Sequence, residues 1–265
     1  MLPAEAVEQN VCEFLLALGR AGGAEERDEP GIQWTVGGSP IDYHNCVVRA
    51  DLTPDATGAA IRGFCAALDR HGVPGTWHIG PSTRPDDLGT RLLAQGFTPG
   101  GEEVGMALDL AALPDTRSTP AGMTVERVAQ QTQLDAFEAV LASGFGEGER
   151  EARWVCEMYA RIGLGDETAW RHYLGRLDGT AVATASLFLT GDVGGLYFIS
   201  TAPAWRKRGI GSAITYAALQ GARQAGCRWA ILSASRAGLP IYQRLGMADV
   251  CRFDLYGWTP RPADG

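Results

Sequence analysis

The chain has 265 residues, 45% of them apolar, with a net charge of −8 at pH 7 and a pI near 5.1. These values are ordinary for one large or two small globular domains. They argue against a general nucleic-acid binder, which needs a positive face for phosphate contacts, and they suit a cationic substrate such as an amine.

Apolar residues recur at helical spacing in the first twenty residues, which predicts an amphipathic helix. Acidic residues interrupt them, so the segment has neither the basic start and unbroken apolar stretch of a signal peptide nor the roughly 20 apolar residues of a membrane span. We therefore expect a cytoplasmic protein with no membrane partner. Glycines, charges and Pro30 predict a linker at residues 19–31.

The six cysteines include no CxxC spacing, and the four histidines form no HxH or HxxxH pair. We expect reduced, buried thiols and no metal site.

The first half holds a strand-like run at residues 46–52, followed by Thr53 and Pro54, which can cap and start a helix. Asp55 suits the helix dipole there without any anion, and no basic cluster follows. Two helix–strand–helix segments are marked by the same residue types: a glycine ends the first helix, a tryptophan begins the strand and a glycine ends the second helix. These residues are Gly72, Trp77 and Gly96 in the first half, and Gly226, Trp229 and Gly246 in the second half. This spacing suggests an internal duplication, although any two helix–strand–helix units could share it.

Two prolines among small polar residues mark the main domain boundary at residues 113–122. Beyond it, Asp178-Gly179 between two strand-like runs predicts a hairpin. The strands first pair by hairpins and later alternate with helices, which predicts an α/β mixed sheet with helices on both faces. The predicted strands are residues 123–128, 170–177, 181–189, 195–201, 229–233 and 250–256, and the predicted helices are residues 132–141, 150–162, 209–225 and 238–245.

The most informative stretch joins the strand at residues 195–201 to the next helix through a turn that reads Arg206-Lys207-Arg208-Gly209-Ile210-Gly211. A helix start exposes unpaired N–H groups and a partial positive charge. Three cations placed there oppose the dipole, so the turn is poor helix design unless an anion binds. Walker and Rossmann phosphate motifs are excluded, because GxxxxGK[ST] is absent and Ile214 stands where the third glycine would be.

At these residues the chain resembles the GNAT superfamily of N-acetyltransferases. Arg206-x-x-Gly209-x-Gly211 matches the signature [RQ]-x-x-G-x-[GA], and Tyr242 followed by Gly246-Met247 echoes the later Tyr…Gly-Phe signature. The resemblance covers residues 123–256. It implies that acetyl-CoA is the cosubstrate and that the strand before the turn and the next strand splay apart to admit it.

The resemblance also implies roles for single residues. Backbone amides from Arg208 to Ser212 would hold the pyrophosphate, backbone groups of Ile199 and Thr201 would pair with the pantetheine arm, and Tyr242 would protonate the leaving thiolate. The full expected cofactor set is Ile199, Thr201, Arg206, Lys207, Arg208, Gly209, Ile210, Gly211, Ser212 and Ser235, the last standing where the family often has asparagine.

The sequence departs from the family where a glutamate often serves as general base, because residues 194–201 contain no carboxylate or histidine. Candidate bases elsewhere are Glu147, Glu149, Asp192 and His172, and a substrate amine that arrives neutral would need none.

We expect an N-terminal helix and linker (1–30), a degenerate GNAT-like domain (31–113) and a catalytic GNAT domain (120–265). The expected activity is transfer of acetyl from acetyl-CoA to a primary amine of a small molecule by direct attack. The alternatives are a non-catalytic CoA sensor and an acyltransferase that uses a longer acyl-CoA. Sequence leaves the oligomeric state open.

Overall fold

The computed structural model describes residues 2–235 and 238–260, which form two compact units. The first unit combines the segment up to Asn10 with residues 104–250, and the second combines residues 11–103 with the segment from Cys251 onward. Each unit therefore takes a strand from the far side of the linker at residues 113–122. The predicted domains, in contrast, were continuous ranges.

The first unit contains a mixed sheet. Strands β6, β7, β8 and β9 pair antiparallel in chain order, β9 pairs parallel with β10, and β10 pairs antiparallel with residues 104–109 of β5. The predicted hairpin is confirmed at the β7–β8 turn, where Asp178 and Gly179 both have positive φ. The strand bounds are β5 Thr98–Asp109, β6 Met123–Arg127, β7 Trp170–Leu177, β8 Thr180–Thr190, β9 Val193–Thr201 and β10 Trp229–Ala234.

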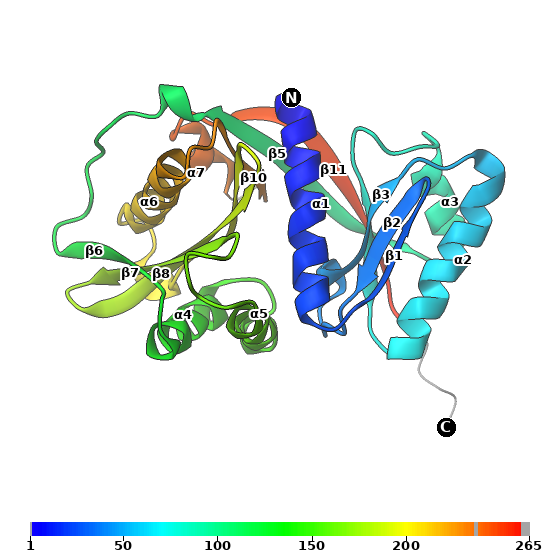
Figure 1. Cartoon of the computed structure of the whole chain (residues 1–265), viewed down its shortest axis with the longest axis horizontal. Helices are drawn as coiled ribbons and strands as arrows, with labels where there is room; N and C mark the ends of the chain where they lie inside the picture. The colour runs from blue at the N-terminus through cyan, green and yellow to red at the C-terminus, as the bar shows by residue number, and fades with distance from the viewer. Residues whose placement is uncertain (1, 236–237, 261–265) are drawn as a thin grey trace. The chain divides into compact units, whose positions relative to one another are not determined.

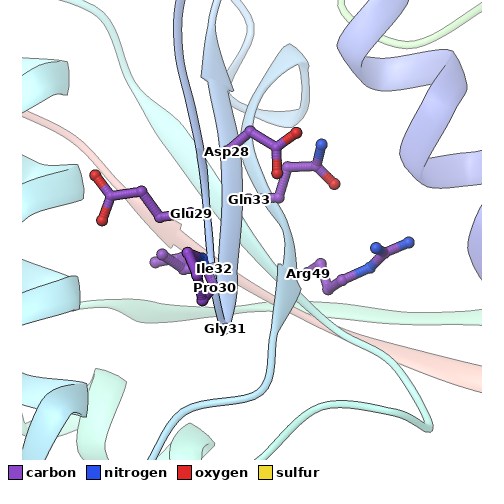
Figure 2. Close-up of a pocket in the computed structure, with 7 residues that line it drawn as sticks. All are labelled: Asp28, Glu29, Pro30, Gly31, Ile32, Gln33 and Arg49. Atoms are coloured by element: carbon purple, nitrogen blue, oxygen red, sulfur yellow. The ribbon is translucent and has the colours of Figure 1, made fainter.

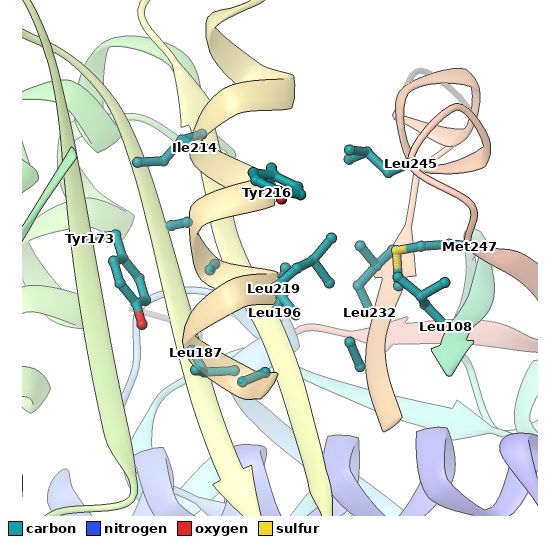
Figure 3. Close-up of a cluster of buried hydrophobic side chains, with 14 of the residues drawn as sticks. Leu108, Tyr173, Leu187, Leu196, Ile214, Tyr216, Leu219, Leu232, Leu245 and Met247 are labelled. Atoms are coloured by element: carbon teal, nitrogen blue, oxygen red, sulfur yellow. The ribbon is translucent and has the colours of Figure 1, made fainter. Parts of the chain in front are cut away.

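Helices cover both faces of this sheet, as predicted (Figure 1). On one face α6 (Ile210–Gln224) packs on β7, β8 and β9, and on the other face α4 (Gln131–Gly144) packs on the same strands beside α5 (Glu149–Ile162). Figure 3 shows Ile214 and Leu219 of α6 among Leu187 and Leu196 of the sheet, all buried. The short helix α7 (Leu239–Gln243) follows β10.

The second unit repeats the pairing pattern. Strands β1 (Glu25–Glu29), β2 (Ile32–Val36) and β3 (Asn45–Ala50) pair antiparallel, β3 pairs parallel with β4 (Gly75–Ile79), and β4 pairs antiparallel with β11 (Ala248–Trp258). Its core holds Trp34, Phe64, Trp77 and Phe97, and its helices are α2 (Pro54–His71) and α3 (Leu88–Ala94). Helix α1 (Pro3–Ala21) passes from the first unit to the second along the chain.

The prediction of a linker at residues 19–31 was wrong, because α1 continues to Ala21 and β1 follows as an edge strand. All five residues of β1 are charged, and two of them form ion pairs with neighbouring helices: Glu25 with Arg70 at 2.5 Å and Glu26 with Arg20 at 2.6 Å. Charged side chains are common on edge strands, and they hide the alternation that identifies a strand in sequence.

All six cysteines are free, four of them buried and two half-buried. Within the described residues, no helix combines the length and apolarity needed to cross a membrane.

Candidate active site

The central feature of the first unit is a split between two parallel strands. β9 and β10 pair only where Val193, Gly194 and Gly195 face residues 229–231. Beyond that point the two described strands are not paired, while β10 stays paired with β5 on its other edge along residues 229–234. The far half of β9 therefore has one backbone edge that no strand covers.

A bulge interrupts the other edge of β9. Thr184 faces Ser200 and Ser186 faces Tyr197, so Phe198 and Ile199 together face the single residue between Thr184 and Ser186. Phe198 has φ of 49°, a conformation that bulky residues rarely adopt. The Thr184 hydroxyl donates a hydrogen bond of 2.9 Å to the Phe198 carbonyl, and Thr184 is fully buried.

The glycine turn joins β9 to α6 in the predicted order. Gly209 is the N-cap, with φ of 79°, and no side chain caps the described first turn. The Ala213 N–H donates to the Gly209 carbonyl at 3.0 Å. The turn therefore presents amides without a side-chain acceptor. In contrast, the Thr53 hydroxyl of the second unit accepts from Ala56 N–H at the start of α2.

The three cations of the turn have different environments. Arg206 donates to the carbonyls of Thr201 at 3.0 Å and Gly144 at 2.8 Å, so it ties the turn to the end of β9 and the end of α4. Arg208 stacks over the Trp205 ring at 4.8 Å. Lys207 is exposed, with φ of 61°. Sequence reasoning assigned all three to the anion, but it missed the carbonyl contacts of Arg206.

Gly211 lies one helical position beyond Ile210, where β9 and α6 approach closely. A Cβ at Gly211 would lie 3.3 Å from the Thr201 hydroxyl oxygen. Ser212 is half-buried in the same turn, and Ile210 is buried beneath it. The end of β9 and the start of α6 are therefore close together at Thr201 and Gly211.

Tyr242 is half-buried on α7 and packs against the core of the first unit. Burial raises the pKa of its phenol to about 12. Among the described residues its hydroxyl makes no hydrogen bond, so its O–H group is available to donate to a ligand. Ser235 is exposed just before α7, where its carbonyl accepts from the N–H groups of Gly238 and Leu239.

The structure explains why the start of β9 carries no carboxylate. A Cβ at Gly194 would lie 2.8 Å from the Ala222 Cβ, and one at Gly195 would lie 1.9 Å from Oδ1 of Asn10. Asn10 of α1 is fully buried, accepts from the Tyr197 hydroxyl at 2.7 Å and donates to the Thr190 hydroxyl at 2.7 Å. An amide from the N-terminal helix therefore occupies the space of a side chain at Gly195.

Two of the four candidate bases are poorly placed. Asp192 precedes β9 at the end opposite the turn, about 20 Å of strand away from Ile199. His172 is buried against the Tyr159 ring at 3.8 Å and bonds the Ser186 hydroxyl at 2.9 Å, and burial lowers its pKa to about 3. It is neutral and enclosed.

The loop between α4 and α5 touches the far half of β9. The Phe145 ring lies 5.4 Å from the Phe198 ring, and exposed Glu147 forms an ion pair with Arg150. Glu149 is exposed at the start of α5. Sequence reasoning missed Glu151, a buried carboxylate that accepts from Glu147 N–H at 2.9 Å. Its place in the first turn of α5 was a usable signal, because a glutamate there often reaches back to preceding amides.

A pocket of about 450 Å³ lies elsewhere, at the β1–β2 hairpin of the second unit. Figure 2 shows Asp28, Gln33 and Arg49 projecting to one side of its strands. None of the residues expected to bind the cofactor lines it.

Comparisons with known proteins agree with this architecture. Residues 134–247 match the sequence profile of the acetyltransferase (GNAT) family. None of the curated protein sequences matches the chain.

Three solved structures illustrate the shared fold. A GCN5-related N-acetyltransferase from Kribbella flavida has a TM-score of 0.74 and 19% identity, over 95% of this chain and 96% of that chain. A functionally unknown conserved protein from Staphylococcus epidermidis has a TM-score of 0.67 and 14% identity, over 90% and 95%. A tandem GNAT protein from the clavulanic acid biosynthesis pathway has a TM-score of 0.61 and 15% identity, over 88% and 79%. Residues 134–247 therefore match the acetyltransferase (GNAT) family, and the chain shares its fold with a tandem GNAT protein over most of that protein's length.

Proposed function

We propose that the first unit transfers an acetyl group from acetyl-CoA to a primary amine of a small molecule. The observation that carries the proposal is the uncapped start of α6, which follows directly from a strand whose far edge is unpaired. A diphosphate supplies the acceptors that the first-turn amides lack. An extended pantetheine arm supplies backbone-like partners to the open edge of β9.

Binding would use the backbone of the glycine turn and of β9. The amides from Arg208 to Ser212 hold the pyrophosphate, and Lys207 adds charge at its exposed position. Ile199 and Thr201 pair with the pantetheine arm. Arg206 holds the turn in place and does not bind the phosphates, because its guanidinium already donates to the Thr201 carbonyl. Gly209, Ile210, Gly211 and Ser235 complete the proposed contact surface.

The chemistry is direct attack in a ternary complex. The amine nitrogen forms a bond to the thioester carbonyl carbon, the carbon–sulfur bond breaks, the thiolate takes a proton, and the nitrogen, cationic after the attack, loses one proton to water. Tyr242 is the proposed donor, because its raised pKa keeps the phenol protonated across the neutral range. A base is not required when the amine arrives neutral.

We further propose that the second unit is a degenerate copy that binds no acetyl-CoA. Thr53 caps α2, and the edge of β3 that corresponds to the open edge of β9 is occupied by the chain itself. Arg84 N–H donates to the Ala50 carbonyl at 2.9 Å, and the Arg84 carbonyl accepts from Leu52 N–H at 3.1 Å. A titration with acetyl-CoA should therefore reach one site per chain, and two equivalent sites would refute the degeneracy.

A non-catalytic CoA sensor is the main alternative, and the glycines at the start of β9 favour it because they leave that strand without a base. Release of free thiol from acetyl-CoA in the presence of a panel of primary amines separates the two. Release that requires both the amine and the protein supports the transferase. Tight binding of acetyl-CoA without thiol release for any amine supports the sensor. Turnover with a longer acyl-CoA but not with acetyl-CoA would identify the longer acyl-CoA as the acyl donor.

A further inference from the structure

We propose that Thr184 is a positioning residue that aims the Ile199 amide at the acetyl carbonyl. The inference rests on the proposed function, because it assigns a role to a contact of the same site. Thr184 lies on β8 and was not among the residues that sequence reasoning singled out.

The first step is the rigidity of one peptide group. The Phe198 carbonyl and the Ile199 N–H belong to the same planar trans peptide, so they point in opposite directions. The Thr184 hydroxyl holds the Phe198 carbonyl at 2.9 Å. It thereby sets the direction of the Ile199 N–H, which points away from Thr184.

The second step is the bulge itself. Phe198 has φ of 49° and lies where the register between β8 and β9 shifts. Thr184 donates to its carbonyl from a fully buried position. Without the hydroxyl, the Phe198 carbonyl loses this hydrogen bond, which helps to hold the strained conformation.

The third step is the location of the amide. Ile199 is the second residue of the bulge and lies on the part of β9 that is not paired with β10. An amide fixed beside this split is positioned to donate to the thioester oxygen, which gains negative charge as the amine attacks. Donors held in place before the reaction stabilise such charge more than mobile ones do.

The test compares Thr184→Val, which keeps the shape and removes the donor, with Thr184→Ser, which keeps the donor. We expect Thr184→Val to lower kcat about tenfold to a hundredfold, with the Kd for acetyl-CoA changed less than about threefold. Thr184→Ser should restore most of kcat. Thr57→Val is a matched control, since the buried Thr57 hydroxyl donates at 3.0 Å to the Thr53 carbonyl in the second unit, and it should leave kcat unchanged.

A spectroscopic readout separates positioning from stability. The infrared band of ¹³C-labelled acetyl carbonyl bound to the wild-type chain should lie at lower frequency than in free acetyl-CoA, and the shift should shrink in Thr184→Val. Equal kcat and an equal carbonyl band in Thr184→Val and the wild type would overturn the inference. If the wild type neither binds acetyl-CoA nor releases thiol, the proposed function fails instead.

Discussion

Tyr242 illustrates how burial selects one protonation state. Its pKa of about 12 lies far above neutrality because the ionised phenolate would be poorly solvated. The phenol is therefore neutral and keeps its proton at working pH. Its O–H group can donate to a departing thiolate, and this stabilises the negative charge that develops on the sulfur as it leaves.

Replacing Tyr242 with phenylalanine should lower kcat about a hundredfold, because the ring still packs while the proton donor is lost. The affinity for acetyl-CoA, measured by calorimetry, should change less than about threefold. Equal losses of kcat and affinity would identify Tyr242 as a packing residue.

The pH dependence adds a control on the same side chain. The phenol must be protonated to act, and its pKa is raised to about 12, so Tyr242 causes no fall in kcat below about pH 11. An alkaline limb between about pH 9 and pH 10 that disappears in Tyr242→Phe would contradict this assignment.

The predicted pyrophosphate site consists of the first turn of α6, and no single side chain forms it. A Cβ at Gly211 would lie 3.3 Å from the Thr201 hydroxyl oxygen, and a bulky side chain there would project into the proposed pyrophosphate site. Gly211→Trp should weaken acetyl-CoA binding more than about a hundredfold, because the amides lose access to the phosphates. Calorimetry on the folded variant measures this.

A matched variant is Gly58→Trp near the start of α2, where the nearest atom outside the helix backbone is the end of the Arg62 side chain. It adds the same ring to a helix that Thr53 already caps, and should leave acetyl-CoA binding intact. Unchanged affinity in Gly211→Trp would remove the turn from the binding site.

Local elements were predictable where their signals are local. The β7–β8 hairpin followed from Asp178-Gly179, and the strand, turn and helix around Gly209 followed from charge and glycine spacing. The strand β1 escaped notice because its charged side chains show no alternation. The αL conformation of Phe198 has no sequence signature, since a donor on another strand supports it.

Contacts between residues far apart in the chain could not be predicted from the sequence either. Asn10 meets Tyr197 across 187 positions, and β10 takes β5 as its partner from before the main linker. Spacing within one half of a chain cannot reveal either contact. Such contacts decide which segments make a compact unit.

Because β5 belongs to the first unit but precedes the linker at residues 113–122, residues 120–265 alone lack part of the core of that unit. Val104, Met106 and Leu108 of β5 are 0–6% exposed in the first unit. Their burial contributes roughly 5–9 kcal/mol, which is comparable to the whole stability of a domain. A fragment of residues 120–265 should therefore aggregate or remain unfolded by circular dichroism.

A fragment of residues 104–265, which restores β5, should be markedly more soluble than the shorter one. A folded, soluble 120–265 fragment that binds acetyl-CoA would show that β5 is dispensable.

Three buried histidines make the chain sensitive to acid. Burial lowers the pKa of His44 to about 3, of His78 to about 4 and of His172 to about 3. Each is neutral when folded and has an ordinary pKa near 6.5 when unfolded. Their contribution is complete above about pH 6.5 and is lost as pH falls toward the folded values. Tm should decline below about pH 6.5, and the decline should be less steep in His172→Gln. An identical slope in the variant would show that His172 does not contribute to the acid sensitivity.

The most direct test of the account is a crystal structure of the chain with acetyl-CoA. We predict pyrophosphate oxygens about 3 Å from the amides of Ile210, Gly211 and Ser212, with the pantetheine arm along the open edge of β9. An acetyl-CoA bound elsewhere, with the start of α6 in contact with solvent alone, would contradict it.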